Sequence, residues 1–170
     1  MRRLFFALLP DAETIRAIDY HTHQYSSLTG KKVKPENYHI TILFLGNVDE
    51  KTHDGVLVAC DSIQSGRLTL EIDEAGYWSK QGILWLGPQE TSIDLLNLVD
   101  ETRQAVNRKN LPMKKTQYHP HITLMRNVKT APQHPLVKPF SWEANSFSLV
   151  QSYTHPEGVQ YRELACWPLL

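Results

Sequence analysis

The sequence contains little cysteine and no excess charge of either sign. Its 170 residues include two cysteines, Cys60 and Cys166, without the spacing of a metal site. Such a composition is typical of thiols in a reducing compartment, so we expect both to be buried and the protein to be cytoplasmic. Lys plus Arg equals Asp plus Glu, at 18 each. No global field would therefore attract long nucleic acid, which leaves a small partner such as an RNA end or a nucleotide.

Long hydrophobic runs are absent as well. No apolar stretch approaches the ~20 residues that span a membrane, so we expect no contact with a membrane. The run from Leu4 to Leu9 follows two arginines, as in a signal peptide. It is too short for that role, and Pro10 and Asp11 stand where a small-residue cleavage site would be needed. The segment therefore predicts a first strand.

One four-residue pattern occurs twice, about half the chain apart: His39–Ile42 (HITI) and His121–Leu124 (HITL). Both copies lie in apolar, β-branched runs that predict strands. Because side chains alternate faces along a strand, the histidine and threonine of each copy share one face and the aliphatic residues point into a core. Polar groups are costly to bury without partners. Two such pairs therefore predict a cleft with two matching walls.

The layout around the two copies is also repeated. Each half reads strand, helix, motif strand, so we expect one α+β domain over residues 1–170, with two pseudo-symmetric lobes at about 1–80 and 81–170 and a groove between them. Pro132, Pro135 and Pro139 predict a loop in the second half. The expected strands are 3–9, 38–45, 68–77, 83–86, 120–125, 147–153 and 159–167, and the expected helices are 12–28, 49–63 and 92–107.

Two facing histidines can divide an acid–base reaction between them. The unperturbed imidazole pKa of ~6.5 lets one ring accept a proton while the other donates one. The threonine hydroxyls could donate to a non-bridging oxygen between the rings. This combination suits in-line displacement at phosphorus and needs no metal and no covalent nucleophile. A single His-x-Thr on a strand is usually structural, but its repetition in matching contexts favours function.

These residues resemble the two-histidine phosphoesterase superfamily, and in particular the bacterial and archaeal RNA 2′,3′-cyclic phosphodiesterases, also called 2′-5′ RNA ligases. Asn37–Gly46 (NYHITILFLG) is similar to the first motif of that family, and His119–Arg126 (HPHITLMR) is similar to the second. Arg3–Leu8 (RLFFAL) resembles its first strand. The resemblance extends over the whole chain.

The resemblance implies two mainly antiparallel sheets flanked by helices around a central groove. It implies hydrolysis of a 2′,3′-cyclic phosphate on an RNA 3′ end or nucleotide, leaving a 2′-phosphate, with 2′-5′ RNA ligation in transfer RNA processing as a further family activity. His121 is then the general base, His39 the general acid, and Thr41 and Thr123 hold the phosphate. No cofactor and no metal is expected, and the protein is expected to be a monomer.

Arg126 and Phe44 each follow their motif histidine by five residues. The resemblance suggests that Arg126 neutralises phosphate charge and that Phe44 stacks on a base. Five is an odd spacing, so an ideal strand would point both side chains away from the histidine face. They reach the groove only if each strand ends, twists or bulges first.

Three alternatives stay open. His119 with His121, or His21 with His23, could bind a metal. The substrate could be another cyclic or 2′-5′ phosphodiester, or the chain could be a non-catalytic module that binds nucleotides or RNA ends. Basic residues precede both motifs and could favour an RNA backbone or simply be solvated: Lys31, Lys32, Lys34, Lys114 and Lys115.

Overall fold

A computed structural model describes residues 1–107, 117–132, 137–156 and 158–170. The described elements are three α-helices, a short 3₁₀ helix and ten strands, all of whose pairings are antiparallel. In chain order they are β1 (Arg2–Leu8), α1 (Ala12–Gln24), β2 (Lys31–Lys32), η1 (Pro35–Asn37), β3 (Ile40–Val48), α2 (Glu50–Cys60), β4 (Leu68–Ile72), β5 (Glu74–Trp78), β6 (Ile83–Gly87), α3 (Ile93–Asn107), β7 (Ile122–Arg126), β8 (Phe140–Ala144), β9 (Ser146–His155) and β10 (Gly158–Pro168).

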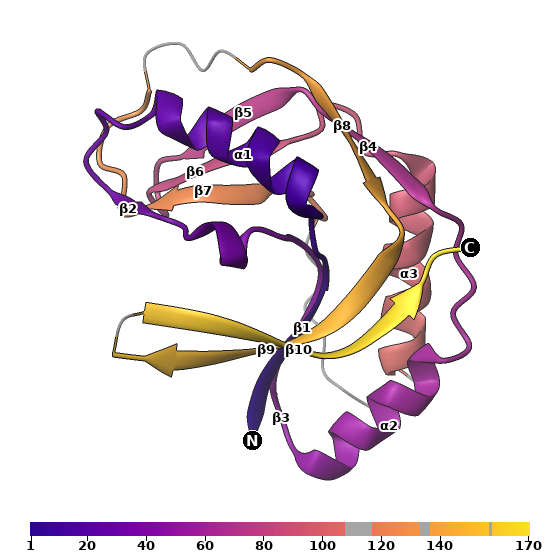
Figure 1. Ribbon diagram of the computed structural model, residues 1–170. Coiled ribbons are helices and arrows are strands. Elements are labelled where there is room, and N and C mark those ends of the chain that lie inside the picture. Colours follow the sequence, from indigo (N-terminus) through magenta and orange to yellow (C-terminus); the bar gives the residue numbers. More distant parts are fainter. Residues whose placement is uncertain (108–116, 133–136, 157) are drawn as a thin grey trace.

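The main sheet has the order β10-β9-β1-β3-β7-β6-β5, with β2 also paired to β7, and β4 pairs with β8 in a second sheet. The two motif strands, β3 and β7, are thus neighbours near the middle of the main sheet. Figure 1 shows α1 over the β5–β6–β7 end, where it packs on β7, and α2 and α3 at the opposite end, where α3 packs on β3. The expected α+β fold with two antiparallel sheets is confirmed.

Strand β1 is buried on both faces, which explains its unbroken apolar sequence. Leu4, Phe6 and Leu8 belong to the main hydrophobic core. Phe5 and Ala7 point the other way and form a small apolar cluster with residues of β9 and β10. This second face of the sheet carries the groove described below.

Two aspartates begin the first two helices, as their positions in the sequence suggest. The Asp11 carboxylate accepts a hydrogen bond from the Thr14 amide at 2.8 Å, and Asp49 accepts one from the Thr52 amide at 2.8 Å. Such caps satisfy amide groups that lack a partner in the first helical turn. Helix α1 ends at Gln24 rather than at the predicted residue 28, because a run of turns follows it.

The single strand predicted at 68–77 is wrong. The chain leaves the second sheet after β4 and enters the main sheet at β5, with Asp73 between them. The Asp73 carboxylate accepts a hydrogen bond from the Gln89 amide at 2.8 Å, which fixes this crossing. Strands β2 and β8 were not predicted either. Pro135, in the proline-rich segment before β8, lies outside the described residues, as do Lys114 and Lys115.

The cysteine prediction is half right. Cys60 is fully buried in α2, whereas Cys166 is exposed. Cys166 lies on β10, the edge strand of the main sheet, opposite Ser148 and away from the core residues on either side of that serine. Among the described helices, none is long and apolar enough to cross a membrane.

Candidate active site

The two copies of the motif meet at the middle of the main sheet. Strands β3 and β7 share one pair in register, Ile40 opposite Ile122. These are the residues that directly follow His39 and His121. Each strand begins at this pair and diverges from the other beyond it. The pairing of equivalent residues is what a pseudo-twofold axis produces, and it brings both histidines to the same part of the groove face.

Each motif histidine is held by the same local hydrogen bond. The Nδ1 atom of His39 lies 2.8 Å from the carbonyl oxygen of Asn37, and that of His121 lies 2.8 Å from the carbonyl oxygen of His119. A carbonyl only accepts, so each Nδ1 carries a proton and donates it. The Nε2 atom of each ring is therefore the one available for proton transfer.

Aromatic rings pack against the His39 imidazole. The centroid of Phe5 lies 5.0 Å from that of His39, and Tyr161 lies 5.1 Å away at a steep angle of 85°. Phe5 and Tyr161 also contact each other at 5.1 Å. The three rings come from β1, the start of β3 and β10, so the ring plane of His39 is fixed by packing as well as by its hydrogen bond.

The His121 imidazole has its own aromatic support on the other side of the central β3–β7 pair. Trp78 of β5 contacts it with a centroid distance of 4.6 Å and an angle of 74°. Trp78 also packs on Trp85 of β6, and Trp85 contacts His119 at 4.7 Å. Each motif histidine is thus held by rings from strands on its own side of the central β3–β7 pair.

Burial disfavours the charged form of both rings. It lowers the pKa of His39 to about 4, with a smaller lowering from positive charge on His121 and Arg126, while the Asn37 carbonyl raises it. Burial is also the main cause that lowers the pKa of His121. An anion bound beside the rings would favour the imidazolium form and raise both pKa values.

A β-bulge follows the motif in β3. Phe6 of β1 pairs with Leu43, but the next residue, Ala7, pairs with Thr41. Ile42 is therefore an extra residue without a partner on β1. Both Ile42 and Leu43 are buried, at the point where the bulge interrupts the alternation of side chains.

The same bulge occurs at the equivalent place in β7. Leu84 of β6 pairs with Met125, whereas Trp85 pairs with Thr123. Leu124 is the extra residue, and both it and Met125 are buried. The two motif strands therefore share one irregularity as well as one sequence.

The bulges determine where Phe44 and Arg126 point. An extra residue reverses the alternation, so Phe44 returns to the face of Thr41 and Arg126 to the face of Thr123. Both side chains line the same cavity as the two threonines. The odd spacing that would direct them away in an ideal strand is thus compensated in each half.

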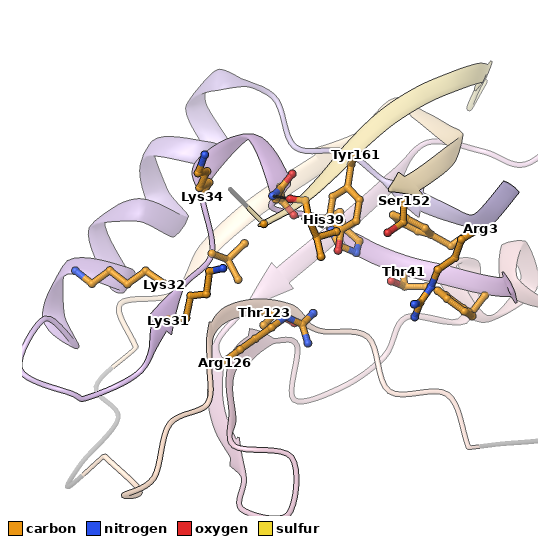
Figure 2. Close-up of a pocket in the computed structure, with 16 residues that line it drawn as sticks. Arg3, Lys31, Lys32, Lys34, His39, Thr41, Thr123, Arg126, Ser152 and Tyr161 are labelled. Carbon is orange, nitrogen blue, oxygen red and sulfur yellow. Dashed lines mark hydrogen bonds between the residues drawn. The ribbon is translucent and has the colours of Figure 1, made fainter. Parts of the chain in front are cut away.

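The groove contains a cavity of about 480 Å³. His39, Thr41, Thr123, Phe44 and Arg126 all line it, and Figure 2 shows Thr123 and Arg126 facing the strand that carries His39 and Thr41. His121 does not belong to its wall. It stays close enough for its charge to lower the pKa of His39.

Sequence reasoning did not identify several lining residues. Arg3, Ser152 and Tyr161 enter the cavity from β1, β9 and β10. The Arg3 guanidinium lies 5.1 Å from the centroid of the Phe44 ring, in a cation–π contact. No local motif marks these positions, because they reach the cavity through strand pairing over long sequence distances. The pairing of Arg3 with Ser152 across β1 and β9 is one example.

Tyr118 is a further residue that the sequence did not point to. Its hydroxyl donates to the carbonyl oxygen of Thr41 at 3.1 Å, so it ties the segment before the second motif to the first motif strand. Burial raises the pKa of this hydroxyl. A tyrosine that stays protonated keeps its donor role across the working pH range.

The part of the chain that the structure describes does not support the alternative of a metal site. No group of three or more His, Cys, Asp or Glu side chains there could hold an ion. His119 and His121 each pack on Trp78, at 5.5 and 4.6 Å. His21 is buried in α1 with its Nε2 3.0 Å from the Lys138 carbonyl, while His23 is exposed.

A His-x-Thr pair stands at the start of each of two adjacent central strands, and three of these four residues line one cation-rich cavity. This arrangement is that of a two-histidine phosphoesterase. Comparison with known proteins agrees with this class. The family model described as LigT like Phosphoesterase matches residues 8–85. The chain is 34% identical to the RNA 2′,3′-cyclic phosphodiesterase of Bacillus subtilis (strain 168), over 79% of this chain and 78% of that protein. This chain belongs to the LigT-like phosphoesterase family and is an enzyme of that kind.

Two further relatives match almost end to end. The RNA 2′,3′-cyclic phosphodiesterase of Escherichia coli (strain K12) is 29% identical, over 99% of this chain and 97% of that protein. The crystal structure of E. coli LigT complexed with 3′-AMP superposes with a TM-score of 0.89 at 28% identity, over 99% of this chain and 98% of that chain. The similarity therefore includes both motifs.

Proposed function

We propose that this enzyme hydrolyses 2′,3′-cyclic phosphates at RNA 3′ ends to 2′-phosphates by acid–base catalysis between its two motif histidines. The observation that carries the proposal is the matched pair of imidazoles. Each ring donates from Nδ1 to a backbone carbonyl and keeps Nε2 free, at 2.8 Å in both cases. The names of the relatives support RNA cyclic phosphate as the substrate.

In the proposed reaction the cyclic phosphate lies between Thr41 and Thr123, whose hydroxyls donate to its non-bridging oxygens. Nε2 of His121 takes a proton from water as the water oxygen bonds to phosphorus. The bond from phosphorus to the 3′-oxygen breaks on the opposite side, and Nε2–H of protonated His39 gives that oxygen its proton. Water is the only co-reactant, and one proton enters and one leaves the pair of rings.

The charges around the cavity suit this reaction. Arg126 lies opposite the His39 side of the cavity and can neutralise the charge that grows on the phosphoryl oxygens. The anion in turn raises the pKa of His39, so substrate binding itself creates the protonated acid that the free enzyme lacks at neutral pH.

The test is product analysis with three substrates in EDTA: an RNA ending in a 2′,3′-cyclic phosphate, a 3′,5′-cyclic nucleotide and a 2′-5′-linked dinucleotide. We expect a 2′-phosphate from the first and little turnover of the others. Preferential turnover of the 3′,5′-cyclic nucleotide or of the 2′-5′-linked dinucleotide would show that the substrate is a different phosphodiester. Binding of all three without turnover would favour the non-catalytic module, and activity that EDTA removes and a metal restores would favour a metal mechanism.

A further inference from the structure

The cavity carries more positive charge than one phosphodiester requires. Its wall includes five cationic residues, of which Lys32 points its side chain away from the cavity in Figure 2, and among the described residues that line it none is Asp or Glu. Arg126 lies beside Thr123, and Arg3 lies over Phe44. Lys31, Lys32 and Lys34, which we call the lysine segment, lie on the side of His39 away from Arg3 and Thr41, where Lys31 neighbours Arg126 (Figure 2). These lysines could bind a second anionic group of the substrate, in addition to the cyclic phosphate.

The lysine segment is fixed in place next to Arg126 by the sheet. Lys31 pairs directly with Arg126 across β2 and β7, and the amide of Val33 donates to the Leu124 carbonyl at 2.8 Å. Gly30 permits this approach, because a Cβ there would lie 3.0 Å from the Arg126 carbonyl oxygen. Strand pairing thus builds the cationic wall.

Like charges opposite each other on paired strands destabilise a sheet unless an anion lies between them. Within the described residues, Lys31 and Arg126 form no ion pair with a carboxylate. Lys34 approaches Glu36 only at the 4.0 Å limit, with both side chains largely exposed. The arrangement is typical of a binding site for several phosphates.

A second cavity of about 190 Å³ continues from this end of the first. The two cavities share part of their wall, and the second adds Tyr153, Gln160 and one carboxylate, Glu36, which lies 4.0 Å from Nζ of Lys34. The shared residues are Lys34, Asn37, Gly158, Val159 and Tyr161. The Asn37 side chain donates to the Val159 carbonyl at 3.0 Å, which closes the floor between η1 and the β9–β10 hairpin.

Gly158, whose φ of 127° favours glycine, lies at the junction between the two cavities, close to Lys31. A Cβ on Gly158 would lie 3.2 Å from Nζ of Lys31, so the missing side chain leaves the ammonium room at this point. Tyr153 offers a partly exposed ring beyond it. Lysines followed by an aromatic ring match the alternation of phosphate and base along a single strand.

We propose that the lysine segment binds the backbone phosphate on the 5′ side of the terminal nucleotide, and that the second cavity accepts the nucleotide before it. This inference rests on the proposed function. The terminal base then lies toward Phe44 and Arg3, and the chain leaves past Gly158 toward Tyr153. An RNA end of two or more nucleotides should therefore be a better substrate than a cyclic mononucleotide.

The experiment compares kcat/KM for a 2′,3′-cyclic mononucleotide, the same nucleotide with a 5′-triphosphate, and a dinucleotide ending in the cyclic phosphate. We expect the dinucleotide to exceed the mononucleotide by tenfold or more. Lys31→Ala, Lys34→Ala and Tyr153→Ala should each lower this ratio severalfold. Lys51→Ala, on the exposed surface of α2, is the matched control and should keep the wild-type ratio.

Salt dependence gives an independent readout. Loss of one phosphate contact should reduce the slope of log affinity against log salt by roughly 0.7 for a single strand. The affinities of the product 2′-phosphates give the ratio of dinucleotide to mononucleotide binding without any turnover. A preference for the dinucleotide can therefore be measured even if the proposed hydrolysis does not occur. A wild-type ratio near one, or a triphosphate that equals the dinucleotide, would overturn the inference while leaving cyclic phosphate hydrolysis intact.

Discussion

The two motif histidines of this enzyme differ in surroundings more than in geometry. Both rings donate from Nδ1 to a carbonyl two residues earlier. His39 is packed between Phe5 and Tyr161, and burial lowers its pKa to about 4. His121 rests on Trp78 at the side of the cavity, and burial lowers its pKa as well. Both rings are therefore neutral in the free enzyme at pH 7.

A first prediction concerns the pH dependence of the rate. One ring must be protonated and the other neutral, so kcat/KM should follow a bell-shaped profile. Because the pKa values of both free-enzyme rings lie below 6.5, the maximum should lie below pH 6.5. Bound substrate is anionic and raises both pKa values, so the maximum of kcat should lie at higher pH. Initial rates from pH 4 to 9 test this, and a kcat/KM profile flat over that range would contradict it.

A second prediction concerns the threonine hydroxyls. Thr41→Val and Thr123→Val keep the side-chain shape but remove a donor to a charged oxygen, which is worth about 1.5–3 kcal/mol. We expect kcat/KM to fall about tenfold or more, with little change in the unfolding midpoint. Thr69→Val, on the exposed face of β4, is the control. Unchanged kcat/KM and unchanged affinity for inorganic phosphate would remove the threonines from the site.

At the scale of elements, the two bulges place the side chains that line the cavity. Ile42 and Leu124 are extra residues at equivalent positions, and each returns a later side chain to the groove face. Trp85 borders the bulge in β7, because it pairs with Thr123. On its other side it pairs with Gly76 of β5. A Cβ at Gly76 would overlap the indole of Trp85.

A third prediction follows from that close approach. Gly76→Ala must displace Trp85, which supports His119 and Trp78. We expect the free energy of unfolding to fall by about 1–3 kcal/mol, as for other overpacked sites, and kcat to fall with it. Gly66→Ala is the matched control, because its Cβ would meet only the Leu170 carbonyl at 3.6 Å. Urea denaturation measures the free energy of unfolding of both variants. Equal values for Gly76→Ala and Gly66→Ala would contradict the close packing of Trp85 on Gly76.

The sequence predicts this molecule well where the signals are local. The repeated His-x-Thr pairs and the order strand–helix–motif strand could both be predicted from neighbouring residues. The sequence did not predict the bulges at Ile42 and Leu124. It showed only that Phe44 and Arg126 reach the groove if each strand ends, twists or bulges first. The change of sheet at Asp73 and the pairing of Lys31 with Arg126 depend on partners far along the chain, so no local pattern predicts them.

For the whole molecule, the lowered histidine pKa values make stability depend on pH. The unfolded chain binds protons near pH 6.5, whereas folded His39 binds one only near pH 4. Between these values the unfolded state holds more protons, so the free energy of unfolding rises with pH. His121 and buried His21 act in the same direction, because burial lowers the pKa of each. Their stabilising contribution is complete above pH 6.5 and is lost as pH falls toward 4.

A fourth prediction tests this linkage. Urea denaturation between pH 7.5 and 4.5 should show falling stability, and His39→Asn should make the fall shallower because one such group is removed. His23→Asn is the control, since that side chain is 71% exposed and folding leaves it in water. An identical pH slope for wild type and His39→Asn would show that the His39 ring is not desolvated as described.

A double-mutant cycle shows whether the two histidines act as one catalytic pair. The measurement is kcat/KM on a short RNA ending in a 2′,3′-cyclic phosphate, in EDTA, for wild type, His39→Ala, His121→Ala and the double variant. We predict that each single change lowers kcat/KM by about 10²–10⁴-fold. Because paired groups are not additive, the double variant should be little worse than the poorer single one. Near wild-type activity in either folded single variant would contradict the account.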